Sequence, residues 1–142
     1  MNRPEKVSTP IPITFHLPVQ QISCGVFYTL LLTKDGRVYG MGNNKYGQLG
    51  TGHKVNECHP TLIRELSDIV KVTAGYHSGA IDKFGSLYIW GSGSFGELLR
   101  PKKFVLSIPI QDIAIRGFFG IAIGHTSKNE NRIYSWGNNT FG

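Results

Sequence analysis

Short runs of alternating apolar and polar residues recur along the chain, separated by turns that contain glycine. Two such runs, residues 29–32 and 38–42, flank Lys34-Asp35-Gly36, and an Asp-Gly pair in that position is typical of a β-hairpin. A helix would need a longer segment with apolar residues every three or four positions. Residues 61–70 come nearest to that pattern, but their β-branched side chains favour a strand. The pattern predicts an all-β chain.

One motif occurs three times along the chain. Its core is an apolar residue, Tyr, any residue, Trp or Met, Gly, three further residues, an aromatic residue and Gly. The motif lies in residues 38–50, 87–98 and 133–142. Related segments precede it: a strand ending in glycine at 22–25, 72–75 and 115–117, a second strand at 29–32, 79–81 and 120–123, and Pro-led segments from Pro12, Pro60 and Pro101. The chain is therefore built from three copies of one unit.

A unit of about 50 residues with about four antiparallel strands cannot bury its apolar face alone. Packing successive units side by side solves this, and four-stranded blades around an axis form a β-propeller. The recurring Tyr and Trp-or-Met positions of the motif are then expected in the core between blades, and Cys24 is expected to be a buried thiol. These positions hold Tyr39, Tyr88 and Tyr134, and Met41, Trp90 and Trp136.

The run from Thr29 to Gly52 resembles a repeat of the regulator of chromosome condensation family. The Trp90-Gly91 and Trp136-Gly137 copies are similar to the same signature, and the resemblance covers roughly residues 11–142. It implies a seven-bladed propeller, of which this chain would hold about three blades. We therefore expect a fragment of a larger protein, or open blade edges capped by the rest of such a protein or by oligomerisation. The expected divisions are a disordered tail at 1–10, then repeats at about 19–68, 69–109 and 110–142.

Charge and cysteine content indicate which partners and which cellular location to expect. The net charge of +6 favours acidic partners, including chromatin or nucleic acid, but the basic residues are dispersed. Their densest cluster is Arg100, Lys102 and Lys103. The two cysteines show no disulfide framework, which predicts reduced thiols and an intracellular location, cytoplasmic or nuclear. No apolar stretch is long enough to span a membrane, so no membrane partner is expected.

The sequence offers no recognisable catalytic chemistry. His53, Cys58 and His59 lie close together, but no second Cys/His pair follows at zinc-ligand spacing. The glycines do not form a phosphate-binding loop, and no nucleophile motif is present. We therefore predict no catalytic residue, no cofactor and no metal. Nucleotide exchange on a small GTPase is the one activity that the resemblance leaves open.

The repeat also predicts a binding surface. Connections in an antiparallel meander alternate between the two ends of a sheet, so the first and third connections of each blade share one end. Exposed aromatic and polar loop residues there would suit a protein partner. For the aromatic residues, partner contact and local packing both remain open. The candidates are Phe27, Tyr76 and Phe118, flanked by Asn43, Asn44, Lys45 and Ser94.

These observations predict a non-catalytic protein–protein interaction module. The resemblance implies that loops at these positions contact the small GTPase Ran in the family's exchange factors, so regulation of a Ran-like GTPase is the alternative. Polar residues often contribute there, whereas this chain has aromatic ones, and the family's long exchange hairpin has no counterpart. The only insertion is a polar loop at 124–131. Attachment to chromatin or nucleic acid is the third hypothesis.

Overall fold

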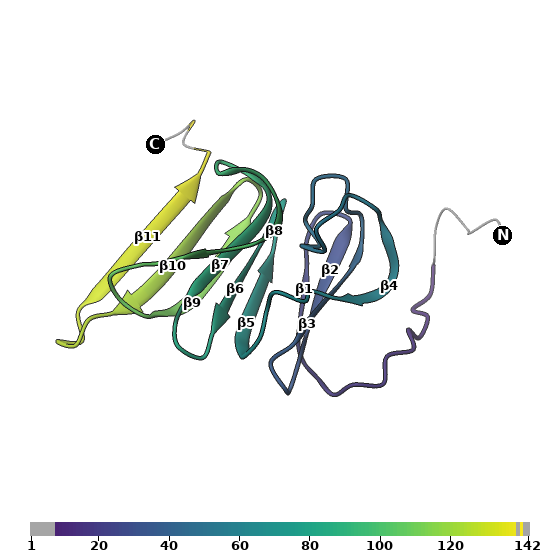
Figure 1. The fold of residues 1–142 in the computed structure, drawn as a ribbon, viewed down its shortest axis with the longest axis horizontal. Helices are drawn as coiled ribbons and strands as arrows, with labels where there is room; N and C mark the ends of the chain where they lie inside the picture. The colour runs from purple at the N-terminus through teal and green to yellow at the C-terminus, as the bar shows by residue number, and fades with distance from the viewer. Residues whose placement is uncertain (1–7, 139, 141–142) are drawn as a thin grey trace.

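The computed structural model describes residues 8–138 and 140, and these form strands and connections without a helix. The strands make three antiparallel sheets, each a meander in chain order (Figure 1). The first sheet holds β1 (Val19–Cys24), β2 (Tyr28–Thr33), β3 (Val38–Gly42) and β4 (Glu57–Leu62). The second holds β5 (Ile69–Ala74), β6 (His77–Asp82), β7 (Leu87–Gly93) and β8 (Gly96–Phe104). The third holds β9 (Ile110–Arg116), β10 (Phe119–His125) and β11 (Asn131–Gly137).

The repeat unit of the sequence corresponds to one sheet. Pro60 and Pro101 lie in the outermost strands β4 and β8, where a missing N–H does not interrupt a central ladder. The insertion in the third copy is the turn between β10 and β11, closed by a hydrogen bond from Thr126 N–H to the Glu130 carbonyl. Within the described residues the third sheet has three strands, so two of the predicted four-stranded blades are complete. No described helix could span a membrane.

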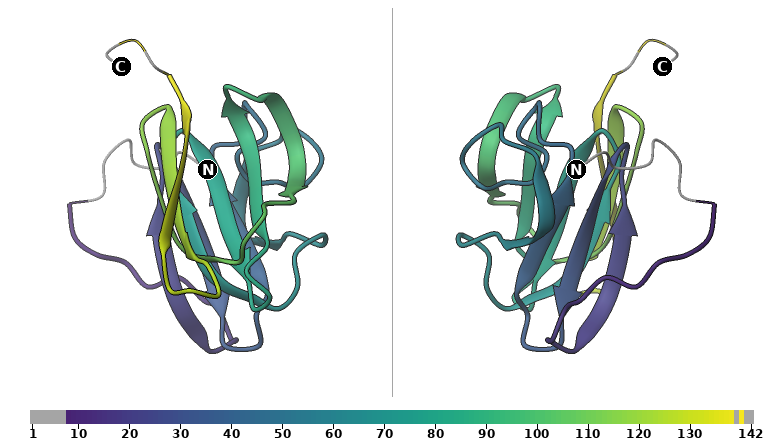
Figure 2. Two further views of the ribbon diagram at one scale, coloured as in Figure 1. Left: turned by 90° about the vertical axis from the view of Figure 1, so that its left-hand side faces the viewer. Right: turned by 90° about the vertical axis from the view of Figure 1, so that its right-hand side faces the viewer.

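The sheets stand side by side with their first strands closest together, as blades of a propeller do (Figures 1 and 2). Side chains of one first strand bond to the backbone of the next. The Gln21 amide bonds both N–H and carbonyl of Val72 at 2.9 Å, and Ser23 Oγ accepts from Ala74 N–H at 3.0 Å. These bonds fix the order and spacing of the blades.

Two apolar cores fill the spaces between the sheets. The first is centred on Leu30, Val72 and Trp90, and the second on Ile81 and Ile113. Of the six motif residues predicted to be core, Trp90 is completely buried, whereas Met41 and Trp136 are half-buried. The three motif tyrosines are half-buried as well. The core prediction therefore holds in full for Trp90 alone, and the other five motif residues are only partly buried.

The expectation of a buried Cys24 is wrong, because this thiol is exposed. Its place in the repeat matches Ala74, which is buried against the first sheet. Cys24 lies on the opposite, outer side of the first sheet, and no described sheet covers that side (Figure 1).

The turn at Gly36 joins the first two blades. Its carbonyl accepts a hydrogen bond from Ile69 N–H at 3.0 Å, and its φ is +77°, a conformation that favours glycine. A Cβ at Gly36 would lie 3.0 Å from the Asp68 Cα. Gly85 repeats this joint, since its carbonyl accepts from Ile110 N–H at 2.9 Å and its φ is +81°.

We expect Gly36→Ala to lower the free energy of unfolding by about 2 kcal/mol, from left-handed backbone strain and crowding against the next blade. Gly96→Ala is the matched control, because Gly96 has φ +84° but nothing within 4 Å of an added Cβ. It should cost about 1 kcal/mol, the backbone strain alone. Urea unfolding followed by tryptophan fluorescence measures both; equal losses would contradict a role of Gly36 in joining the blades.

Candidate functional site

The first and third connections of a blade meet at one end of its sheet, as the meander predicts. Asn43 N–H, which begins the third connection of the first blade, donates to the Phe27 carbonyl at 2.8 Å. Asn138 N–H donates to the Phe118 carbonyl at 3.3 Å in the third blade. The β2–β3 turn at Gly36 lies at the opposite end. The predicted binding residues are therefore gathered at one end of the three sheets.

The first connections of the three blades form a continuous row. Val26 N–H donates to the Gly75 carbonyl at 3.0 Å, and Tyr76 N–H donates to the Gly117 carbonyl at 3.2 Å. Through these bonds, the aromatic residues Phe27, Tyr76 and Phe118 follow one another along the row. We call these three residues the aromatic rim.

All three side chains of the aromatic rim are exposed. Tyr76 and Phe118 stack on each other with ring centroids 4.1 Å apart and an interplanar angle of 12°. Phe27 is 82% exposed and has a φ of +63°, an uncommon conformation for a bulky residue that costs on the order of 1–2 kcal/mol. The rim thus combines a preformed aromatic stack with a phenyl ring that faces solvent. Both features suit contact with another protein.

Three polar candidates flank the rim. Lys45 and Ser94 are exposed in the third connections of the first and second blades. Asn43 is half-buried, and its side-chain oxygen accepts hydrogen bonds from Lys45 N–H and from the Gln48 amide, both at 3.0 Å. Asn43 therefore shapes the loop that presents Lys45.

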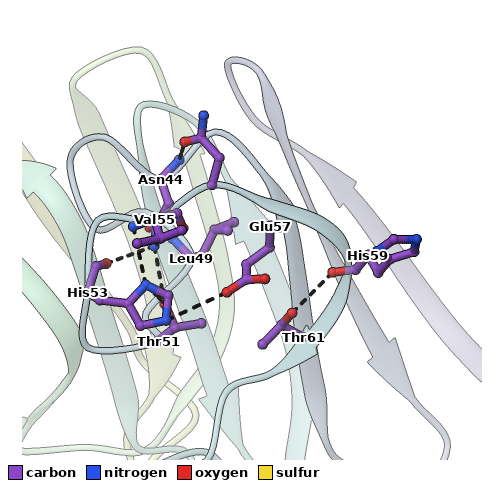
Figure 3. A network of polar contacts seen from close by, with 9 residues as sticks. Asn44, Leu49, Thr51, His53, Val55, Glu57, His59 and Thr61 are labelled. Atoms are coloured by element: carbon purple, nitrogen blue, oxygen red, sulfur yellow. Dashed lines mark hydrogen bonds and ion pairs between the residues drawn. The ribbon is translucent and has the colours of Figure 1, made fainter. Parts of the chain in front are cut away.

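Asn44 is not available to a partner, because its side chain is completely buried inside the connection between β3 and β4 (Figure 3). Its amide N–H groups lie 2.8 Å from the His53 carbonyl and 3.1 Å from both Thr51 Oγ1 and the Val55 carbonyl. Its oxygen accepts from Leu49 N–H at 2.9 Å. This corrects the place of Asn44 in the candidate surface: it holds a long connection together from within.

Two further aromatic residues lie in the third connections and were missed by the sequence-based site. Tyr46 is 43% exposed and carries the Lys45 ammonium 5.4 Å from its ring centre, while Phe95 is 40% exposed. Both occupy the aromatic position of the repeat motif. That recurrence was the available signal, although Phe95 also packs against Phe104 of β8, with ring centroids 4.9 Å apart.

The histidines and cysteines that could suggest a metal site or a reactive thiol do not form one. His53 Nε2 lies 3.6 Å from the Glu57 carboxylate and its Nδ1 accepts from Val55 N–H, while His59 points away from both (Figure 3). Across residues 8–138 and 140, no three His, Cys, Asp or Glu side chains are grouped to hold a metal ion. Neither Cys24 nor Cys58 forms a disulfide.

The basic cluster at 100–103 is partly neutralised. Arg100 pairs with Glu65, and Lys103 lies 3.8 Å from the Asp82 carboxylate. The Lys102 ammonium lies 5.5 Å from the ring centre of Phe104. Counterion release, the main driving force for binding nucleic acid, needs free cations along a surface. This arrangement disfavours a nucleic-acid stripe there.

Comparison with known proteins identifies the family to which the repeats are similar. Residues 35–81 match the regulator of chromosome condensation (RCC1) repeat, and residues 19–48 match a second description of the same repeat. Over 123 residues the chain is 32% identical to the ultraviolet-B receptor UVR8 of Arabidopsis thaliana. That similarity covers 83% of this chain and 28% of the receptor.

Solved structures share the fold. Human WBSCR16 superposes with a TM-score of 0.75 at 24% identity, covering 87% of this chain and 34% of that protein. Prp20p from Saccharomyces cerevisiae, described together with its binding to Gsp1p and histones, superposes with a TM-score of 0.69 at 22% identity. This superposition covers 84% of this chain and 33% of Prp20p. The chain thus spans about a third of the length of each of these three proteins. Its repeats, sheets and relatives agree, and the chain belongs to the regulator of chromosome condensation repeat family.

Proposed function

We propose that the chain is a non-catalytic protein-interaction module that binds its partner through the aromatic rim. The stacked Tyr76–Phe118 pair carries this proposal. An exposed stack held by inter-blade hydrogen bonds loses little conformational entropy on binding, and aromatic residues dominate the energetics of protein interfaces. Lys45 beside the rim, together with the net charge of +6, favours a partner with an acidic surface.

Capture from cell extract with quantitative mass spectrometry tests the rim. We expect the triple variant Phe27→Ala, Tyr76→Ala, Phe118→Ala to lose at least about tenfold of partner capture, because interface aromatic residues contribute about 1–2 kcal/mol or more each. All three side chains are exposed, so the fold should persist.

The matched control carries Phe84→Ala and Val105→Ala. Both residues are exposed, at 69% and 91%, and Phe84 lies in the β6–β7 turn at the end opposite to the rim. Capture by this variant should equal that of the wild type. Equal capture by the rim variant would remove the rim from the interaction.

A second candidate function is regulation of a small GTPase. It is supported by the similarity to Prp20p, which binds Gsp1p. Release of a fluorescent guanine nucleotide from a purified Ran-like GTPase tests it, with and without the chain. If the chain at micromolar concentration does not accelerate nucleotide release, exchange activity is eliminated, whereas the proposed protein-interaction function is unaffected. An intracellular location, cytoplasmic or nuclear, remains a prediction.

A further inference from the structure

A polar pocket lies at the junction of the first two blades, beside their outermost strands. Its volume is about 320 Å³, and its walls come from the long connection between β3 and β4, the end of β4 with the turn after it, and β8. It shares no residue with the aromatic rim. We call it the junction pocket, and its polar lining consists of Thr51, His53, Thr61, Arg64, Glu65 and Arg100.

The two sides of the junction pocket are tied together by contacts between the blades. Gly52 N–H donates to the Leu99 carbonyl at 2.9 Å, which joins the long connection of the first blade to β8 of the second. Lys54 pairs with Glu97 across the same contact. The pocket therefore depends on the packing of both blades and lies in the interior of the row of sheets.

The guanidinium group of Arg100 is held in place within the pocket. Its Nη1 pairs with the Glu65 carboxylate. A Cβ added at Gly52 would lie 2.5 Å from the Arg100 Cζ, so the absent side chain of this glycine leaves the room that the guanidinium occupies. The Arg100 side chain is still 60% exposed, so the N–H donors that Glu65 does not use remain accessible to a ligand. A guanidinium oriented in advance loses little entropy on binding.

The second cation of the pocket has no ion-pair partner among residues 8–138 and 140. Arg64 is exposed in the turn after β4, which is closed by a hydrogen bond from Leu66 N–H to the Ile63 carbonyl at 3.3 Å. Two arginines and one glutamate leave the lining with a net charge of +1 when His53 is neutral (two minus one). An anion would relieve the repulsion between the two guanidinium groups.

Hydroxyl groups complete the donor set. Thr51 Oγ1 accepts from the Asn44 amide at 3.1 Å, and its own O–H has only a 3.4 Å contact with His53 Nδ1, which a ligand oxygen would replace (Figure 3). Thr61 Oγ1 donates to the His59 carbonyl at 3.1 Å. The pocket thus offers two guanidinium groups and a hydroxyl group to one ligand, a set that suits an anion with several oxygen atoms.

A phosphate monoester fits this donor set best. It carries about −1.5 to −2 charges at pH 7 and three acceptor oxygens, so it engages both guanidinium groups and a hydroxyl at once and outweighs the repulsion from Glu65. A carboxylate has one charge and two oxygens. A membrane or a nucleic acid would need an extended surface of free cations, whereas the basic cluster at 100–103 is partly neutralised.

We propose that the junction pocket binds a phosphorylated serine or threonine side chain of a protein partner. The nature of the partner rests on the proposed protein-interaction function, and the pocket adds a second contact to it, one that is made only after the partner is phosphorylated. Leu62, which also lines the pocket, gives the carbon chain of such a residue an apolar contact that a free anion lacks.

Amide NMR of the isotope-labelled full chain tests the pocket, with N-acetyl-phosphoserine amide as the probe. We expect saturable shifts at Thr51 and Gly52. N-acetyl-aspartate amide should bind at least about tenfold more weakly, and inorganic phosphate several-fold more weakly. Equal affinity for the aspartate compound would overturn the preference for phosphate, and equal affinity for inorganic phosphate would overturn the assignment to a protein side chain.

Single substitutions test the residues. Arg64→Gln and Arg100→Gln should each weaken binding of the phosphoserine compound at least about fivefold, because each removes a charge-assisted contact. Glu65→Gln should strengthen binding several-fold, since it removes the negative charge beside the ligand. Lys34→Gln is the matched control, because it removes one exposed positive charge in the β2–β3 turn, and it should bind as the wild type does. Losses equal to that of Lys34→Gln would show general charge attraction and overturn the site.

Two further measurements separate this proposal from others. The rim variant Phe27→Ala, Tyr76→Ala, Phe118→Ala should bind the phosphoserine compound as the wild type does, so failure of the rim and failure of the pocket are distinct results. Co-sedimentation with phosphatidylcholine vesicles that contain phosphatidic acid should capture no chain. Capture that Arg64→Gln abolishes would assign the pocket to a lipid headgroup and overturn the proposal, as would a wild-type chain that shows no saturable shifts at millimolar phosphoserine compound.

Discussion

Trp90→Ala is expected to lower the free energy of unfolding by about 3–5 kcal/mol, the range for removing a large buried aromatic side chain. The Trp90 indole is completely buried between the first and second sheets. It stacks close to Gly50, where an added Cβ would lie 2.8 Å from Nε1, and this nitrogen donates to the Gln48 carbonyl at 2.9 Å. Truncation would leave a cavity at the centre of the first core. Chemical denaturation followed by circular dichroism measures the loss.

Trp136→Ala is the matched control, because it removes the same side chain at the same motif position. Trp136 is half-buried, so its loss should be clearly smaller, on the order of 1–2 kcal/mol. Equal losses for the two variants would contradict the conclusion that the first junction is the more tightly packed.

Acidification from pH 6.5 to about pH 4 is expected to reduce stability by about 3 kcal/mol through His77 alone. Burial lowers the pKa of His77 to about 4. Its Nε2 accepts a hydrogen bond from Trp136 Nε1 at 3.0 Å, and its Nδ1 is buried without a partner among the described residues. Between pH 6.5 and 4, His77 is protonated in the unfolded chain but stays neutral in the folded chain, so the free energy of unfolding falls as pH falls. Above pH 6.5 both states are neutral and the effect vanishes.

The variant His77→Phe isolates this contribution. Phenylalanine stands at the equivalent position 119, but this substitution also removes the acceptor of Trp136 Nε1, so the variant should be less stable than the wild type at neutral pH. Its unfolding free energy should be nearly flat between pH 6.5 and 4.5. The hydrogen bond from Lys71 lowers the pKa of Asp112 below 3.8, so stability from that carboxylate is lost only at lower pH. A wild-type slope that persists in His77→Phe would contradict the assignment.

The sequence predicted the sheets well because each strand is defined locally. Alternation, Asp-Gly turns and the repeated motif fix where strands begin and end, and repetition fixes that the sheets pack in order. The end of the sheet that carries Phe27, Tyr76 and Phe118 followed from the meander alone. Whether these residues bind a partner is not a local property, and it stays a proposal.

Burial was predicted less well because it depends on what lies across each residue. Cys24 and Ala74 occupy the same repeat position, but only Ala74 faces another sheet. Asn44 sits in a sequence typical of an exposed turn. The long connection after it folds back so that three acceptors, at residues 51, 53 and 55, surround its amide. Neither arrangement leaves a signal in the residue itself.

The two blade junctions differ in how strongly a single substitution can weaken the packing of one blade on the next. Trp90 donates to a main-chain carbonyl at position 48, which every amino acid supplies. Trp136 donates to the imidazole of His77 instead, because the connection after β7 is a short hairpin with no counterpart of the Gln48 loop. Substitution of the side chain at position 48 therefore keeps the hydrogen bond of Trp90 at the first junction. The second depends on one side chain, and variation at position 77 would tune how firmly the third blade is held.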